Sequence, residues 1–151
     1  MKSGKGRGAI EKVVRLRKHE EREAAAGLLV KKRQLAELDG KVREAEDELA
    51  KRLHEAQERR ADLKKSLGGE MKASRAAGRL SHIRSIEEAC NRIKGRIAML
   101  QRDRGRVESE LERERRNLAE KFADKRSAQK YLESLEKEAE QEKEKKQEDG
   151  D

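Results

Sequence analysis

Histidine, cysteine and glycine residues are the first candidates for chemistry in this sequence, and none of them is spaced for it. His19, His54 and His82 never recur at the spacing of metal ligands, and Cys90 has no neighbouring Cys or His to complete a zinc site. Residues 4–8 (GKGRG) lack the spacing of a phosphate-binding loop and follow no predicted strand. We therefore interpret this glycine segment as a disordered tail, the histidines as solvated and the cysteine as a packed residue.

The carboxylates also lack a catalytic arrangement. The chain has 32 Asp and Glu against 40 Lys and Arg, and the two kinds alternate along the sequence as exposed helical pairs do. No pair of carboxylates falls in an apolar surrounding that could hold one as an acid and the other as a base. The sequence predicts no enzyme, no cofactor and no metal.

Composition restricts the fold to a thin helical structure. Of 151 residues, 48% are charged, 32% are hydrophobic and 1% are aromatic, which is too little apolar material for a compact core. Proline is absent, which favours long helices. A single cysteine suits a reducing compartment, and neither a long apolar run nor a signal-peptide pattern occurs. We expect a cytoplasmic protein that does not insert into a membrane.

Apolar residues recur every seven positions in both halves, as in coiled-coil helices. The first stripe runs through residue 14 and every seventh residue after it, and through residue 83 in the same way. A second stripe lies three residues further along each heptad. The apolar residues that we assign to the seam between the helices are Val14, Leu28, Leu35, Val42, Leu49, Leu63, Ile83, Ile97, Leu111, Leu118 and Leu132.

The heptads stop near Gly68 and Gly69 and restart after Ser81, which we expect to cap the second helix. The predicted fold is all-α, a long antiparallel two-helix coiled-coil hairpin that forms a single domain over residues 1–151. The predicted segments are helix one at about 9–65, a turn at about 66–80 and helix two at about 81–146, with flexible tails.

Polar residues in the stripes predict the register. In an antiparallel hairpin the numbers of facing residues add to a constant, and a sum of 146 places Glu21 against Lys125. In the second stripe, a sum of 145 places Lys31 against Glu114. A slip of one heptad would set Glu21 against leucine, a mismatch that penalises the wrong register.

The net charge of +8 is unevenly distributed. Residues 1–18 carry seven Lys or Arg against one Glu, whereas residues 133–151 carry nine acids against four lysines. A nucleic-acid-binding hairpin is one open interpretation of the basic groups, but Phe122 and Tyr131 are the only aromatic residues that could stack on bases. We expect no nucleic acid partner and interpret the basic groups as solvated helical faces.

Several segments resemble the FliJ/YscO family, the stalk proteins of flagellar and virulence type III secretion systems. The first helix begins with VVRLRKHEEREAA (residues 13–25), which is similar to the family's helix start. The second half resembles the family's return helix in its apolar spacing, in residues 126–132 with Leu135, Glu136 and Lys137, and in the acidic tail QED at residues 147–149. The apolar positions that carry this likeness are Leu80, Ile83, Ile86, Ile93, Ile97 and Leu100.

The resemblance implies a non-enzymatic cytoplasmic protein at the base of an export apparatus. Its paired helix ends would enter and stimulate a hexameric export ATPase, and the opposite end would meet the cytoplasmic ring protein of the export gate. Export chaperones are a further implied partner. The residues implied to contact the ATPase ring are Leu16, Lys18, Tyr131 and Leu135. The residues implied to contact the gate are Met71, Leu80 and His82.

Residue patterns alone also leave open a generic coiled-coil scaffold or tether that associates with other chains. A hairpin that buries its own seam predicts a monomer, which separates it from a tether that forms its coiled coil between chains.

Overall fold

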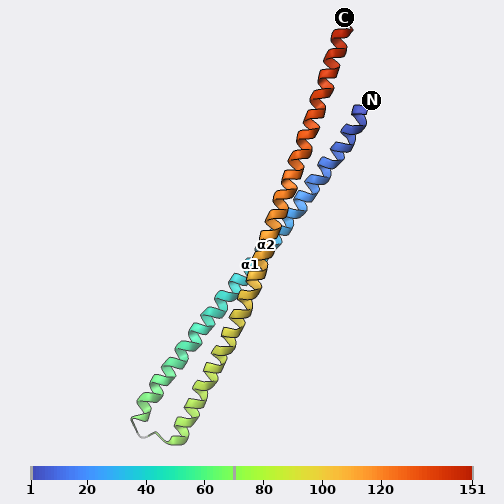
Figure 1. The fold of residues 1–151 in the computed structure, drawn as a ribbon. Helices are drawn as coiled ribbons and strands as arrows, with labels where there is room; N and C mark the ends of the chain where they lie inside the picture. Colours follow the sequence, from blue (N-terminus) through green and yellow to red (C-terminus); the bar gives the residue numbers. More distant parts are fainter. Residues whose placement is uncertain (1, 70, 151) are drawn as a thin grey trace. The chain divides into compact units, whose positions relative to one another are not determined.

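The computed structural model describes residues 2–69 and 71–150, and these residues form two long helices. Helix α1 spans Lys2–Leu67 and helix α2 spans Ala73–Asp149 (Figure 1). No strand occurs in the described part of the chain. The predicted fold class, an all-α antiparallel two-helix hairpin, is confirmed.

Contacts between the helices divide the chain into two compact units. Unit one combines Met1–Lys32 with Ser109–Asp151, and unit two is the continuous segment Arg33–Glu108. Each unit pairs a length of α1 with an antiparallel length of α2. Unit one contains both chain ends, and unit two contains the turn. We call the part of the hairpin next to the chain ends the open end, and the part next to the turn the closed end.

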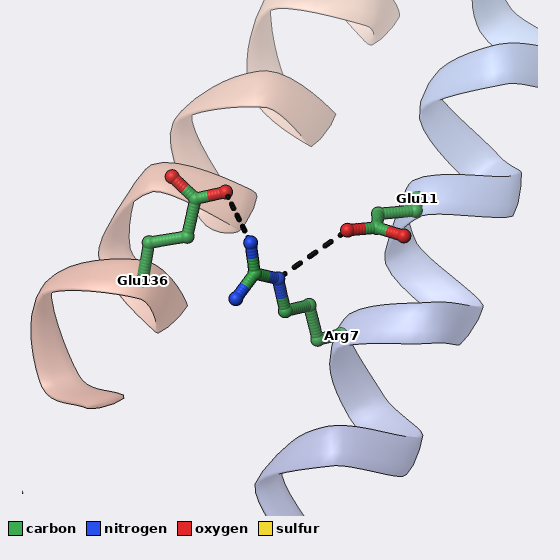
Figure 2. A network of polar contacts seen from close by, with 3 residues as sticks. All are labelled: Arg7, Glu11 and Glu136. Carbon is green, nitrogen blue, oxygen red and sulfur yellow. Dashed lines mark hydrogen bonds and ion pairs between the residues drawn. The ribbon is translucent and has the colours of Figure 1, made fainter. Parts of the chain in front are cut away.

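Helix α1 begins at Lys2, whereas we predicted a start at about residue 9 after a disordered tail. Ion pairs hold the first turns of α1 in place. The Arg7 guanidinium lies 3.3 Å from Glu11 of the same helix and 3.3 Å from Glu136 of α2 (Figure 2). These pairs help to offset the helix-weakening glycines around Arg7, each of which costs about 1 kcal/mol against alanine. The prediction of a non-helical segment at residues 4–8 is therefore wrong.

The turn is also shorter than the predicted 66–80. The amide of Gly69 donates to the carbonyl of Ser66 at 3.2 Å, and the amide of Arg75 donates to the carbonyl of Lys72 at 3.0 Å, where α2 begins. Ser81 is an exposed residue inside α2 and caps nothing. Alanine, arginine and leucine dominate the sequence from Ala73 to Leu80, and their helix propensity extends α2 by two turns beyond the heptad pattern.

At the other end, α2 continues to Asp149 in place of a flexible tail after residue 146. Its last residues alternate Glu and Lys at helical spacings of three and four, which supports an exposed helix without a core.

The interior is formed by alanines of α1 against β-branched residues of α2. Ala45 and Ala56 are 3% and 5% exposed, and Ile83 is the one fully buried large side chain in the described residues, at 1%. Small residues on one helix allow the partner helix to approach closely, and the isoleucines fill the remaining space. Burial is densest in unit two. The buried residues are Val14, Ala24, Ala45, Ala56, Leu63, Ile83, Ile86, Cys90, Ile93, Val107 and Leu111.

None of the residues that we assigned to the seam is exposed. Four of them are buried, namely Val14, Leu63, Ile83 and Leu111. The other seven are half-buried, namely Leu28, Leu35, Val42, Leu49, Ile97, Leu118 and Leu132. Cys90 is 2% exposed and packs with Ala56 and Ile86, which agrees with its interpretation as a packed residue.

The ion pairs between helices test the register directly. Lys125 Nζ lies 2.6 Å from Glu21 Oε2, as the sum of 146 predicts. The second predicted pair is wrong, because Lys31 Nζ lies 2.5 Å from Glu110, one helical turn before Glu114. The long side chain of Lys31 extends out of the seam and reaches the Glu110 carboxylate at the edge of the seam. Glu114 lies instead beside Gly27, where an added β-carbon would be 3.2 Å from Oε2.

Candidate contact surfaces

The described histidines and acids form no candidate metal centre. No cluster of three or more His, Cys, Asp or Glu that could hold a metal occurs in residues 2–69 and 71–150. His19 and His54 each contact a glutamate four residues further along α1, at 3.0 and 2.9 Å, on the exposed surface. No helix in the same residues is long and apolar enough to cross a membrane. The candidate sites described below are the exposed surfaces of the two helices.

Two flanks run along each unit, one on either side of the seam. We call the residue directly before each first-stripe residue a g position and the fourth residue after it an e position. Cross-helix ion pairs show that like flanks lie together. Arg60 pairs with Glu87, and both are e positions of unit two. In unit one, Arg17 contacts Glu20 at 3.0 Å and Asp124 at 3.8 Å, and both of these acids are g positions.

Glu20 is the centre of this charged network on the g flank of unit one. It accepts a hydrogen bond from Arg17, and Lys121 of α2 lies 3.5 Å from the same carboxylate. The hydrogen bond from Arg17 is the main cause that lowers the pKa of Glu20 below its ordinary value, and the charge of Lys121 adds to the effect. The network ties the g flanks of α1 and α2 to each other.

An apolar patch lies one heptad from this network towards the open end. Val13 and Tyr131 are the g positions one heptad from Glu20 and Asp124, and Leu16 lies one turn after Val13 on the same side of α1. These three side chains are 40%, 59% and 53% exposed. We call Val13, Leu16 and Tyr131 the open-end patch. It is unusual on a surface that is otherwise mainly charged.

The structure brings together only part of the predicted ATPase-contact set. Leu16 and Tyr131 share the open-end patch, whereas Lys18 is an exposed e position on the opposite flank. Leu135 belongs to the second stripe and is half-buried in the seam. Sequence reasoning missed Phe122, which is 46% exposed on the e flank with Lys125 Nζ 4.8 Å from its ring centroid. Phe122 lies four residues after the seam residue Leu118, at an e position, and this spacing could have identified it.

The residues predicted to contact the gate also separate. Met71 is half-buried in the turn, Leu80 is 38% exposed at an e position of α2, and His82 is exposed at a g position. The missed residue here is Leu67, the last residue of α1, which is 58% exposed. Leu67 lies four residues after Leu63, the last residue of the first stripe in this half, and directly before Gly68. This position could have identified it.

A basic concavity lies on the g flank near the closed end. It has a volume of about 600 Å³, and its floor is Ile83. Arg79 donates a hydrogen bond to the hydroxyl of Ser66 at 3.4 Å, whereas Arg59 lies 3.3 Å from Glu55 of its own helix. Among the residues that line this opening, three arginines, Arg59, Arg75 and Arg79, face one acid, Asp62. The remaining lining residues are Gly78 and His82.

Comparisons with known proteins give no match that indicates a function. No family model matches the chain, and neither a curated protein nor a solved structure matches it. The class that the fold defines is a two-helix coiled-coil hairpin.

Proposed function

We propose that this protein is a non-enzymatic stalk of a type III export apparatus, a cytoplasmic protein that links and stimulates a hexameric export ATPase. The open-end patch is the observation that carries this proposal. Val13, Leu16 and Tyr131 come from both helices, share one flank and are each at least 40% exposed in the described part of the chain. Exposed aromatic and aliphatic side chains from two elements are typical anchors of a protein interface.

Charge supports a contact of the same end with another protein. The open end combines the basic residues 1–18 with the acidic residues 133–151. A partner ring with both signs of charge could orient this end as it approaches, because complementary charges raise association rates and select the correct orientation. Arg7 already pairs with Glu136 within the chain (Figure 2), so charges of both helices lie together at this end.

The closed end would then meet the cytoplasmic ring of the export gate through residues near Met71, Leu80 and His82, with export chaperones as a further partner. A link between two machines requires two chemically different ends, and this chain has them. One end has a mixed-charge surface with an aromatic anchor, and the other has a basic surface with aliphatic residues only. The chain itself would be a monomer.

Co-purification of the purified chain with a candidate export ATPase tests the proposal. The patch variant Leu16→Ser/Tyr131→Ser should lose most of the binding, because each truncated anchor typically weakens an interface by about 1–2 kcal/mol or more. The matched control is Leu29→Ser/Met99→Ser, which removes two side chains that are 50% and 65% exposed outside the patch. Equal binding by both variants, or no binding of the unaltered chain to any export ATPase, contradicts the proposal.

A further inference from the structure

The closed end carries an unbalanced group of cations. Residues 59–84 contain eight Lys or Arg against two acids, and two of the eight, Arg59 and Arg60, pair with Glu55 and Glu87 just outside this segment. We call these eight residues the closed-end cluster. The cluster consists of Arg59, Arg60, Lys64, Lys65, Lys72, Arg75, Arg79 and Arg84.

The cluster surrounds the hairpin end and does not form a stripe along one side. Arg60 is on the e flank and pairs with Glu87, whereas Arg75 is on the g flank and lines the basic concavity. Lys64 and Lys65 are exposed in the last turn of α1, on the side away from the seam. A peptide that lies along one flank would meet only some of these charges. An extended anionic plane that the end approaches would meet the cations next to the turn on both helices, namely Lys64, Lys65, Lys72 and Arg75.

Exposed aliphatic residues lie among these cations. Leu67 is 58% exposed at the end of α1, and Leu80 is 38% exposed on α2 close to the turn. Met71 follows the turn glycines and is half-buried. Basic residues around a small apolar tip are the composition of surfaces that bind at the headgroup level of a membrane without crossing it. Binding of single-stranded nucleic acid would instead favour stacking aromatics, which the sequence of the closed end lacks.

We propose that the closed end docks on an anionic lipid surface. Lys64, Lys65 and Lys72 beside the turn lie over lipid phosphates, and the concavity beside Arg75 and Arg79 accepts one headgroup. Leu67 reaches the boundary between headgroups and acyl chains. This proposal goes beyond the stalk function and does not depend on it, since it concerns the lipid next to the closed end and needs neither an ATPase nor a gate protein.

Vesicle sedimentation with the full chain tests the proposal. The chain should bind vesicles that contain about one-third phosphatidylserine, should not bind pure phosphatidylcholine, and should dissociate as salt rises. Each basic residue near an anionic surface strengthens binding about fivefold. The variant Lys64→Gln/Lys65→Gln/Lys72→Gln should therefore bind about 100-fold more weakly.

A matched control removes the same amount of charge elsewhere. Arg113→Gln/Arg115→Gln/Arg116→Gln changes three exposed arginines of unit one and should bind within about fivefold of the unaltered chain. Circular dichroism of both variants checks that their helix content is unchanged. Equal losses in the two variants would mean that the whole chain is attracted by its net charge, which overturns a closed-end site.

Tryptophan fluorescence provides a second readout, since the chain has no native tryptophan. Leu67→Trp should shift to shorter wavelength when anionic vesicles are added, and Met99→Trp, outside the closed end, should not. The absence of a shift at residue 67 contradicts the proposed depth. Salt-sensitive retention of a DNA or RNA duplex by the closed-end cluster, without vesicle binding, would assign the surface to nucleic acid instead and overturn the lipid proposal.

Discussion

The pair of Glu21 and Lys125 makes the register testable by charge exchange. Lys125 Nζ lies 2.6 Å from Glu21 Oε2, and the two side chains are only 18% and 24% exposed. Glu21→Lys would place two ammonium groups against each other in the seam. Exposed ion pairs contribute about 0.2–1 kcal/mol, and this pair is more protected from water than those. Loss of the attraction together with the new repulsion should lower the free energy of unfolding by about 2 kcal/mol.

The exchange variant Glu21→Lys/Lys125→Glu isolates the pairing from the effect of each residue. It should recover more than half of the lost stability, because the opposite charges face each other again. For a chain of this length, 1 kcal/mol corresponds to about 2–4 °C in the unfolding midpoint, so the single variant should melt about 4–8 °C lower.

Thermal and urea unfolding followed by circular dichroism measures both effects. Glu112→Lys is the matched control, since Glu112 pairs with Arg116 of its own helix and the two side chains are 56% and 78% exposed. It should change the stability by less than about 0.5 kcal/mol. A Glu21→Lys variant as stable as this control, or an exchange variant no better than the single one, would refute the register.

Three further predictions concern burial and charge. Ile83→Ala should destabilise the chain by about 2–4 kcal/mol in urea unfolding, because its side chain is 1% exposed, while Leu53→Ala, at 38% exposure, should cost less than half as much. Cys90 is 2% exposed, so a maleimide should label it at least about tenfold more slowly in the folded chain than in urea, and equal rates would contradict its packing against Ala56. The lowered pKa of Glu20 means that its carboxylate stabilises the fold above the unfolded pKa near 4.5, and this contribution is lost as the pH falls through the folded pKa. The stability difference between the chain and Glu20→Gln should therefore be constant at neutral pH and disappear in acid, and a difference that grows as pH falls would show the opposite sign.

Heptad periodicity was sufficient to predict the hairpin and the Glu21–Lys125 contact, because both depend on which residues face the seam. It failed at Lys31, whose long side chain reaches Glu110 at the edge of the seam and does not stay opposite Glu114. It also misplaced the helix ends, since α2 begins at Ala73, before its apolar stripe starts. Helix propensity decides such ends, and a seam pattern does not contain that information.

The contact surfaces were harder to predict than the seam. Leu16 and Tyr131 lie far apart in the sequence, and their common flank becomes visible only after Arg17 is found between Glu20 and Asp124. Leu67 and Phe122 were missed because the prediction used only the two seam stripes, whereas both residues are e positions beside the seam. Met71, Leu80 and His82 were predicted as one contact set, and their side chains lie in the turn and on two different flanks.

Stimulation of ATP hydrolysis tests the stalk proposal most directly. The rate of a purified hexameric export ATPase should rise when the full chain is added, and Leu29→Ser/Met99→Ser should stimulate it equally well. Leu16→Ser/Tyr131→Ser should have lost most of the stimulation while retaining its helix content. An ATPase rate that does not change with the full chain, or that the patch variant raises as much as the unaltered chain does, would contradict the proposed function.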